Sequence, residues 1–243
     1  NRNGIAAKGS TDLRDNKWHH VTAVYDGSNK YIYVDGSLEA TQSSSRSTPS
    51  TSTSKKLIIG HVNHSVGSNE FFPGKIDEAA IWSGALSQSE VIAIYNSGTA
   101  LDLRSNSGDY QSKSNLKAYW KMEDGSGTTL TDVSSYGNDG TINGASWTTG
   151  ILSTSYDNTP ASYGNSLSFD GNNDLVSIQP SASILIDGAI SLSAWVKIPV
   201  SHNSNWGTIF GGYDEYHFNL YAGSNNSSSN GVVQLENRNG IAA

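Results

Sequence analysis

Cysteine is absent from this chain of 243 residues, methionine occurs once, and only 15% of the residues are charged. The net charge is −7, and no basic run is longer than Lys55-Lys56. Nucleic-acid binding needs a positive surface that displaces counterions from phosphates, so no nucleic-acid partner is predicted. No apolar run approaches the roughly 20 residues of a membrane-spanning helix, so no membrane insertion is predicted. Without disulfides, the fold also needs no oxidising compartment.

Small polar residues take the place of the missing charged ones. The chain contains 40 Ser, 23 Asn, 16 Thr and 25 Gly. These residues favour turns and strands, because the side chains of Ser, Thr and Asn compete for backbone hydrogen bonds inside helices. Six Trp and twelve Tyr still provide enough apolar surface for a core. The composition therefore excludes an all-helical fold and indicates a globular, β-rich one.

Hydrophobic periodicity along the chain also indicates a β-rich fold. Residues 190–198 alternate between apolar and polar side chains, as in a half-buried strand. Residues 21–25, which follow Trp18-His19-His20, alternate in the same way. The turn Asp26-Gly27 comes next, then the strand signal of residues 31–34 and the turn Asp35-Gly36, which indicates a meander of hairpins. Further strands are expected at 55–61, 74–82, 116–121, 138–143, 165–170, 174–178, 207–211, 215–221 and 231–236.

One short helix is expected at about 87–96. Ser87-Gln-Ser-Glu90 is a capping box, in which the first and last side chains satisfy free amides at the helix start. Many short strands with a single helix predict an all-β fold, an antiparallel two-sheet jelly-roll sandwich.

The two ends of the chain carry the same sequence. Residues 1–7 and residues 237–243 both read NRNGIAA, 236 residues apart. Such a duplication indicates a window of just over one period from a tandem array of whole domains. A deliberate duplication at a permuted junction is the alternative. Residues 101–114 are polar and are expected to form the linker between repeats, which divides the chain into residues 1–100 and 115–243.

Several motifs make the chain similar to a known family. Trp18-His19-His20-Val21, Tyr33-Val34-Asp35-Gly36 and residues 74–95 resemble the C-terminal half of laminin-G-like, concanavalin A-like jelly rolls. Residues 116–140 and 166–171 resemble the N-terminal half of the same fold. The halves stand in swapped order. The resemblance therefore implies that residues 1–100 end one jelly roll and that residues 115–243 begin the next one, or the same one in permuted order.

No enzyme activity is expected. Glycoside hydrolases related to this architecture carry alternating carboxylates on one strand, because a retaining mechanism needs two carboxyl groups about 5–5.5 Å apart. No such run occurs here. Asp77 and Glu78 are adjacent, so they are expected to point to opposite faces of a strand.

The resemblance does imply a structural Ca²⁺ site. Its ligands would be Asp77, the backbone of Gly171 and the backbone of residues 121–123, represented by Met122. Several hard oxygen ligands of this kind suit calcium. The alternative is that Asp77 only caps or pairs locally.

A sugar-binding surface is a further candidate. Trp206, Tyr213 and Tyr216, with Asn205 nearby, combine aromatic rings with a polar amide. These residues are compatible with a lectin and equally with a polar surface or a subunit contact.

Together, these observations predict a non-enzymatic structural and adhesive repeat of a long extracellular or cell-surface protein or filament. Its partners would be neighbouring copies of the same repeat, with glycans as further candidates. A carbohydrate-binding lectin module is the first alternative, and a glycosidase-type enzyme is the second.

Overall fold

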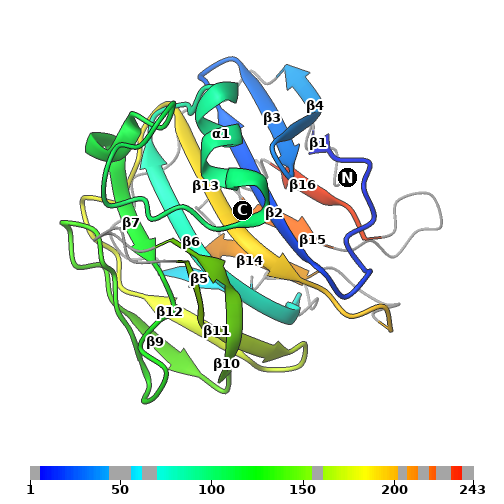
Figure 1. Ribbon diagram of the computed structural model, residues 1–243, viewed down its shortest axis with the longest axis vertical. Coiled ribbons are helices and arrows are strands. Elements are labelled where there is room, and N and C mark those ends of the chain that lie inside the picture. Colours follow the sequence, from blue (N-terminus) through cyan, green and yellow to red (C-terminus); the bar gives the residue numbers. More distant parts are fainter. Residues whose placement is uncertain are drawn as a thin grey trace, which may run out of the picture.

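The computed structural model describes residues 6–43, 56–61, 70–154, 161–201, 207–212, 219–222 and 231–236. Within these residues the chain forms two antiparallel sheets of eight strands each (Figure 1). The all-β sandwich expected from the sequence is confirmed.

The first sheet, sheet A, contains in spatial order β1 (Ala7–Lys8), β16 (Val233–Glu236), β15 (Asn219–Ala222), β14 (Gly207–Gly212), β5 (Leu57–Ile59), β12 (Leu175–Ile178), β9 (Gly140–Asn143) and β8 (Thr129–Leu130). The second, sheet B, contains β10 (Ser146–Ser153), β11 (Ser162–Asp170), β6 (Pro73–Ser83), β13 (Ile190–Lys197), β2 (Trp18–Tyr25), β3 (Asn29–Val34) and β4 (Ser37–Ser43). β7 (Leu116–Trp120) also pairs with β6, beside the part of that strand that β11 leaves free.

The main core lies between the two sheets. Sheet B contributes Ile32, Trp120 and Val196, and sheet A contributes Phe210 and Val233, all of them buried. The alternation expected over 190–198 holds, because Leu192, Ala194, Val196 and Ile198 all join this core. Burial of these apolar side chains is the main stabilising contribution to the sandwich.

Strands from the two segments of the chain interleave. In sheet B, β13 lies between β2 and β6, and in sheet A, β5 lies between β12 and β14. Residues 6–100 and residues 115–236 therefore build one sandwich within this chain. Neither segment has a complete sheet without the other.

The outer face of sheet B is covered by a second layer. The helix α1 (Gln88–Tyr95) crosses this face (Figure 1) and begins at the expected capping box of Ser87 and Glu90. Val91 and Ile94 from the helix pack with Trp82 and Tyr119 of the sheet. This layer gives sheet B a buried outer face as well as a buried inner one.

The segment 101–114 belongs to the same layer. Leu103 and Tyr110 are 1% and 0% exposed. The Trp82 indole N–H donates to the Tyr110 hydroxyl at 3.1 Å, and that hydroxyl donates to the Leu103 carbonyl at 3.2 Å. In this chain the segment is thus packed onto the sandwich and is not an exposed linker. That it also connects successive repeats stays a prediction.

Candidate functional site

A bulge in β6 determines the direction of the two acidic side chains that are adjacent in that strand. The pairing of β6 with β13 is regular up to Ser193 and shifts before Trp195, and Glu78 has a positive φ of 48°. Ile76 and Ala79 both face the core between the sheets. The two residues between them, Asp77 and Glu78, therefore lie together on the outer side of sheet B. The expectation that they point to opposite faces was wrong, because it assumed a regular strand.

Asp77 is held by backbone amides. It is 1% exposed, and its Oδ1 and Oδ2 accept hydrogen bonds from the amides of Glu78 at 2.8 Å and Ile151 at 2.9 Å. Burial, followed by the charge of Glu78, raises the pKa of Asp77 well above its usual range. Oδ2 thus attaches the start of the bulge to β10, while Oδ1 holds the backbone of the bulge itself.

Glu78 lies in a network of polar side chains. It is 4% exposed and accepts a hydrogen bond from the hydroxyl of Tyr119. Burial raises the pKa of Glu78 to about 8, while the charge of Lys121 and the Tyr119 hydrogen bond oppose that rise.

The next members of this network are two cations paired with Asp102. Lys121 Nζ lies 3.3 Å and Arg104 Nη2 lies 2.6 Å from Asp102 Oδ2. Although Asp102 is 3% exposed, these contacts hold its pKa below the usual range against the effect of burial. The network therefore places a stable ion pair beside a carboxyl group, Glu78, that burial favours in its neutral form.

Backbone atoms close the site over the acidic pair. At Gly150 of β10, a Cβ atom would lie 2.3 Å from Asp77 Oδ2 and 2.3 Å from the Asn165 carbonyl oxygen. Only a residue without a side chain allows β10 to approach this closely. The acidic pair is thus enclosed by protein, whereas a hydrolase needs its two carboxyl groups open to a sugar and to water.

The expected calcium ligands do not converge. Gly171 follows β11 and lies against Pro73, at the start of β6. Four residues of extended strand, about 13 Å, separate Pro73 from Asp77. Met122 follows β7, has a φ of 58° and buries its side chain in the core between the sheets. Because both Asp77 oxygens already accept backbone amides, these three residues do not fit a single calcium site, and calcium binding itself stays a prediction.

The described residues contain no group of three or more His, Asp or Glu side chains arranged to hold a metal. Nor do they contain a helix long and apolar enough to cross a membrane.

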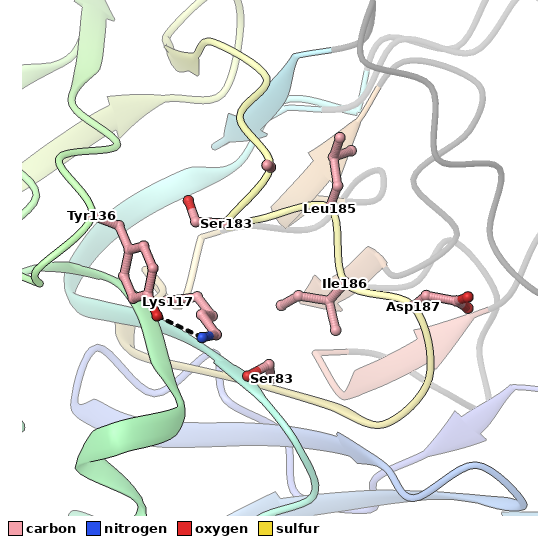
Figure 2. Close-up of a pocket in the computed structure, with 8 residues that line it drawn as sticks. Ser83, Lys117, Tyr136, Ser183, Leu185, Ile186 and Asp187 are labelled. Carbon is pink, nitrogen blue, oxygen red and sulfur yellow. Dashed lines mark hydrogen bonds between the residues drawn. The ribbon is translucent and has the colours of Figure 1, made fainter.

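An open pocket of about 530 Å³ is present at one end of sheet B (Figure 2). Its lining residues are Ser83, Lys117, Tyr136, Ala182, Ser183, Leu185, Ile186 and Asp187. Figure 2 shows Tyr136 and Lys117 on one side and the 183–187 loop on the other, with Ile186 pointing toward Lys117. Lys117 Nζ lies 2.6 Å from the Tyr136 hydroxyl, and the Tyr136 side chain is 45% exposed. Lys117 Nζ also lies over one face of the Tyr136 ring, 4.6 Å from its centroid, so the pocket offers a half-exposed aromatic ring with a cation against it.

The expected sugar-binding residues Trp206, Tyr213, Tyr216 and Asn205 lie outside the described residues. None of the residues that line the pocket was singled out in the sequence. Tyr136 stands in a Ser- and Gly-rich turn with no local pattern that marks it. The pocket arises because the loop before β13 comes to lie beside β7, which is a long-range event.

The fold defines this chain as an antiparallel β-sandwich of the jelly-roll class. Residues 1–92 match the family model described as the concanavalin A-like lectin/glucanases superfamily. The match confirms the laminin-G-like resemblance. The superfamily includes both lectins and glucanases, so the match does not separate sugar binding from hydrolysis. No curated protein and no solved structure gives a significant match.

Proposed function

We propose that this chain is a non-enzymatic structural and adhesive repeat of an extracellular surface protein or filament. The observation that carries the proposal is the position of the first and last described strands. β1 and β16 are neighbours in sheet A; one copy of the repeated seven residues ends in β1, at Ala7, and the other follows β16 directly in the sequence. A domain whose ends meet in this way can be followed by a second copy without any further connecting chain.

The burial and the hydrogen bonds of the acidic pair support a function without catalysis. Asp77 and Glu78 are the adjacent carboxyl groups on the central strand β6, and they are 1% and 4% exposed. Their oxygens bind backbone amides and the Tyr119 hydroxyl. Opening Asp77 to a polysaccharide would require β10 to move away, because Ile151 and Gly150 of that strand lie against its carboxyl group. Their arrangement is that of groups that attach strands to one another.

The proposal is tested with a chain of two successive periods. We expect the second copy to add a second cooperative unfolding unit with the same melting temperature, measured by calorimetry and by single-molecule stretching. We also expect no release of reducing ends from a panel of β-glucans. A second copy that leaves the number of unfolding units unchanged, or measurable hydrolysis that Glu78→Gln abolishes, contradicts the proposal.

Carbohydrate binding is a second candidate function, favoured by the pocket around Tyr136. Sugar sites combine an accessible aromatic face with a few polar groups that fix orientation. Tyr136 supplies the ring, while Lys117, Ser183 and Asp187 supply polar groups around the same opening. The pocket is large enough for one or two sugar rings, given that small-molecule sites are typically about 300–1,000 Å³.

A glycan array followed by titration calorimetry tests this candidate. Tyr136→Ala is expected to weaken saturable binding about tenfold, which corresponds to ~1.4 kcal/mol. Tyr163→Ala is the matched control, since Tyr163 is 69% exposed on β11 and does not line the pocket. Loss of binding in Trp206→Ala with unchanged binding in Tyr136→Ala would instead locate the sugar site at the aromatic residues around Trp206.

A further inference from the structure

His19 and His20 are adjacent in β2, and strand alternation gives the two rings different surroundings. His20 is 1% exposed on the outer face of sheet B, where its ring stacks on Tyr95 and packs against Trp195. Its Nδ1 has no hydrogen-bond partner among the described residues. Burial lowers the pKa of His20 to about 4. His20 is therefore a neutral aromatic residue at neutral pH.

His19 lies between two carboxylates that come from different parts of the chain. Its Nδ1 is 2.8 Å from Oδ2 of Asp35, in the turn between β3 and β4, and its Nε2 is 3.1 Å from Oδ1 of Asp15, in the connection from β1 to β2. A neutral imidazole has one N–H and one lone pair, so it can donate to only one of these oxygens and turns its lone pair toward the other. The imidazolium form donates to both. The geometry therefore favours the charged ring.

The other charged and titratable groups around this ring do not oppose its charge. Lys17 is already paired with Asp15, since its Nζ lies 3.2 Å from Asp15 Oδ2. β13 places the uncharged Val196 opposite the ring, and Lys197 follows on the other face of the sheet. From α1 the nearest titratable group is the phenol of Tyr95, which burial keeps neutral by raising its pKa. The two carboxylates are therefore the groups that decide the charge of the ring.

Asp15 lies near the end of the connection from β1 in sheet A to β2 in sheet B. Its Oδ1, the oxygen that His19 contacts, also accepts the Lys17 amide at 2.9 Å. The amide of Asn16, between them, donates to the Ile198 carbonyl at 3.0 Å. The bond to His19 is thus what ties the Asp15 carboxylate to β2.

Asp35 holds the turn between β3 and β4 on the other side of the ring. It has a φ of 49°, its Oδ1 accepts the His20 amide at 2.9 Å, and its own amide donates to the His20 carbonyl at 2.8 Å. The turn also lies against α1, since a Cβ atom at Gly36 would be 3.2 Å from the Tyr95 ring. His19 therefore joins the connection between the two sheets to the turn that lies under the helix.

We propose that Asp15, His19 and Asp35 form a pH-sensitive latch, closed by the charged ring and released when the ring loses its proton. The neutral ring keeps the shorter bond to Asp35, which is also held by two backbone hydrogen bonds, so the Asp15 side opens. The latch is a property of these described residues, and it stands or falls separately from the proposed adhesive function.

The direction of the pH dependence follows from the two carboxylates. The hydrogen bond to Asp35 raises the pKa of His19 above its ordinary value of 6.5, against the effect of burial. A group with a raised pKa in the folded state contributes its full stabilisation below its pKa in the unfolded chain. The latch is therefore closed below pH ~6.5 and opens as the pH rises through the raised value.

An NMR titration of the ring protons of both histidines tests the charge. We expect the His19 midpoint above pH 6.5 and the His20 midpoint well below it. Asp35→Asn removes the charge but keeps an oxygen for the His20 amide, and asparagine tolerates a positive φ. This variant should lower the His19 midpoint by about one pH unit or more. A wild-type His19 midpoint at or below 6.5 overturns the proposal.

Asp26→Asn is the matched control for that titration. Asp26 follows β2 as Asp35 follows β3, and its carboxylate accepts the amides of Ser28 and Asn29 within its own turn. We expect this variant to leave the His19 midpoint unchanged. An equal decrease in both variants would show that the ring responds only to the overall charge of the protein, and it would overturn the latch.

Amide hydrogen exchange tests the release itself. The Lys17 amide should lose about tenfold in protection, relative to its intrinsic exchange rate, as the pH rises through the His19 midpoint, because its acceptor is the carboxylate that is released. The Ser10 amide, in the same connection, donates to Glu39 Oε2 at 2.7 Å and should keep its protection. A general loss of stability with pH would affect both amides alike, and equal losses would therefore overturn the proposal.

His19→Gln completes the test, since a glutamine side chain does not change its charge with pH. We expect the Lys17 amide of this variant to be less protected than that of the wild type at pH 6 and equally protected at pH 9. A pH-dependent loss of protection that persists in His19→Gln would show that another group releases the connection, and it would overturn the assignment to His19.

Discussion

At pH 8, a Glu78→Gln variant is expected to unfold at a higher temperature than the wild-type protein, and near pH 4 the difference is expected to disappear. The reason is the burial of Glu78, which raises its pKa to about 8 from the ordinary value of 4.5. Below pH ~4.5 the carboxyl group is protonated in both the folded and the unfolded chain, so its ionisation does not change the free energy of unfolding. Between pH ~4.5 and ~8 the unfolded chain releases the proton while the folded one retains it. Stability therefore falls as pH rises through this range.

Glutamine keeps the acceptor for Tyr119 and removes the charge that is costly to bury. Since one pKa unit corresponds to about 1.4 kcal/mol, the gain in unfolding free energy at pH 8 should reach a few kcal/mol. Removing the Glu78 charge also removes one of the causes that raise the pKa of Asp77. This adds to the gain in stability of Glu78→Gln at high pH. Thermal melts at intervals from pH 4 to pH 9 measure the difference.

Tyr119→Phe is the informative partner variant for this experiment. The Tyr119 hydroxyl donates to Glu78 and lowers its pKa, so its loss should extend the pH range of falling stability to higher pH. Parallel stability curves for wild type and Glu78→Gln would contradict the burial argument. They would show that water reaches the carboxyl group and that the acidic pair is open, which would also revive the enzyme alternative.

A second large effect is expected for Gly150→Ala. The new Cβ atom would lie 2.3 Å from the Asn165 carbonyl oxygen, which belongs to the backbone of the neighbouring strand β11. It would also lie 2.3 Å from Asp77 Oδ2, whose partner is the amide of Ile151. β11 is hydrogen-bonded to β10 on one side and to β6 on the other, so its backbone cannot yield; β10 must move instead, and the Asp77 hydrogen bond is lost. We expect a loss of about 3 kcal/mol in unfolding free energy, measured by urea titration.

Gly164→Ala on β11 is the matched control. Its Cβ atom would also come too close to another atom, but that atom is the carboxylate end of Glu123, a flexible side chain. Neither Gly150 nor Gly164 has a positive φ, so backbone strain contributes to neither substitution. The loss at Gly164 should be no more than about 1 kcal/mol. Similar losses at the two positions would show that β10 is free to shift and does not seal the acidic pair.

The predicted sandwich was confirmed where the evidence was local. The strand predicted at 21–25 ends where expected and begins three residues earlier, at Trp18, and the second strand of that hairpin begins two residues earlier than predicted. The capping box of Ser87 and Glu90 starts the helix as expected. These features depend on neighbouring residues, whose turn preferences and periodicity can be read directly from the sequence.

The prediction was wrong at the acidic pair for a physical reason. Strict alternation puts Asp77 and Glu78 on opposite faces, but the bulge at Glu78 inserts one residue and turns both outward. A bulge depends on how β6 fits against β13, whose residues follow their partners in β6 by 107 positions or more. No sequence pattern within β6 announces it. The burial of Tyr110 in a polar segment was missed for the same reason, because its partner Trp82 lies outside the segment.

By itself, the sequence determined the β-rich class, the hairpins, the helix start and the repeated segment at the two ends. It did so because these features follow from side-chain periodicity, turn chemistry and identity, all of which act over short distances. Only the tertiary structure decided that the two segments share one sandwich, that Asp77 and Glu78 are enclosed together, and that β1 pairs with β16. Those outcomes depend on which strands become neighbours, and pairing between strands is selected by burial of the whole core and not by any one stretch of chain.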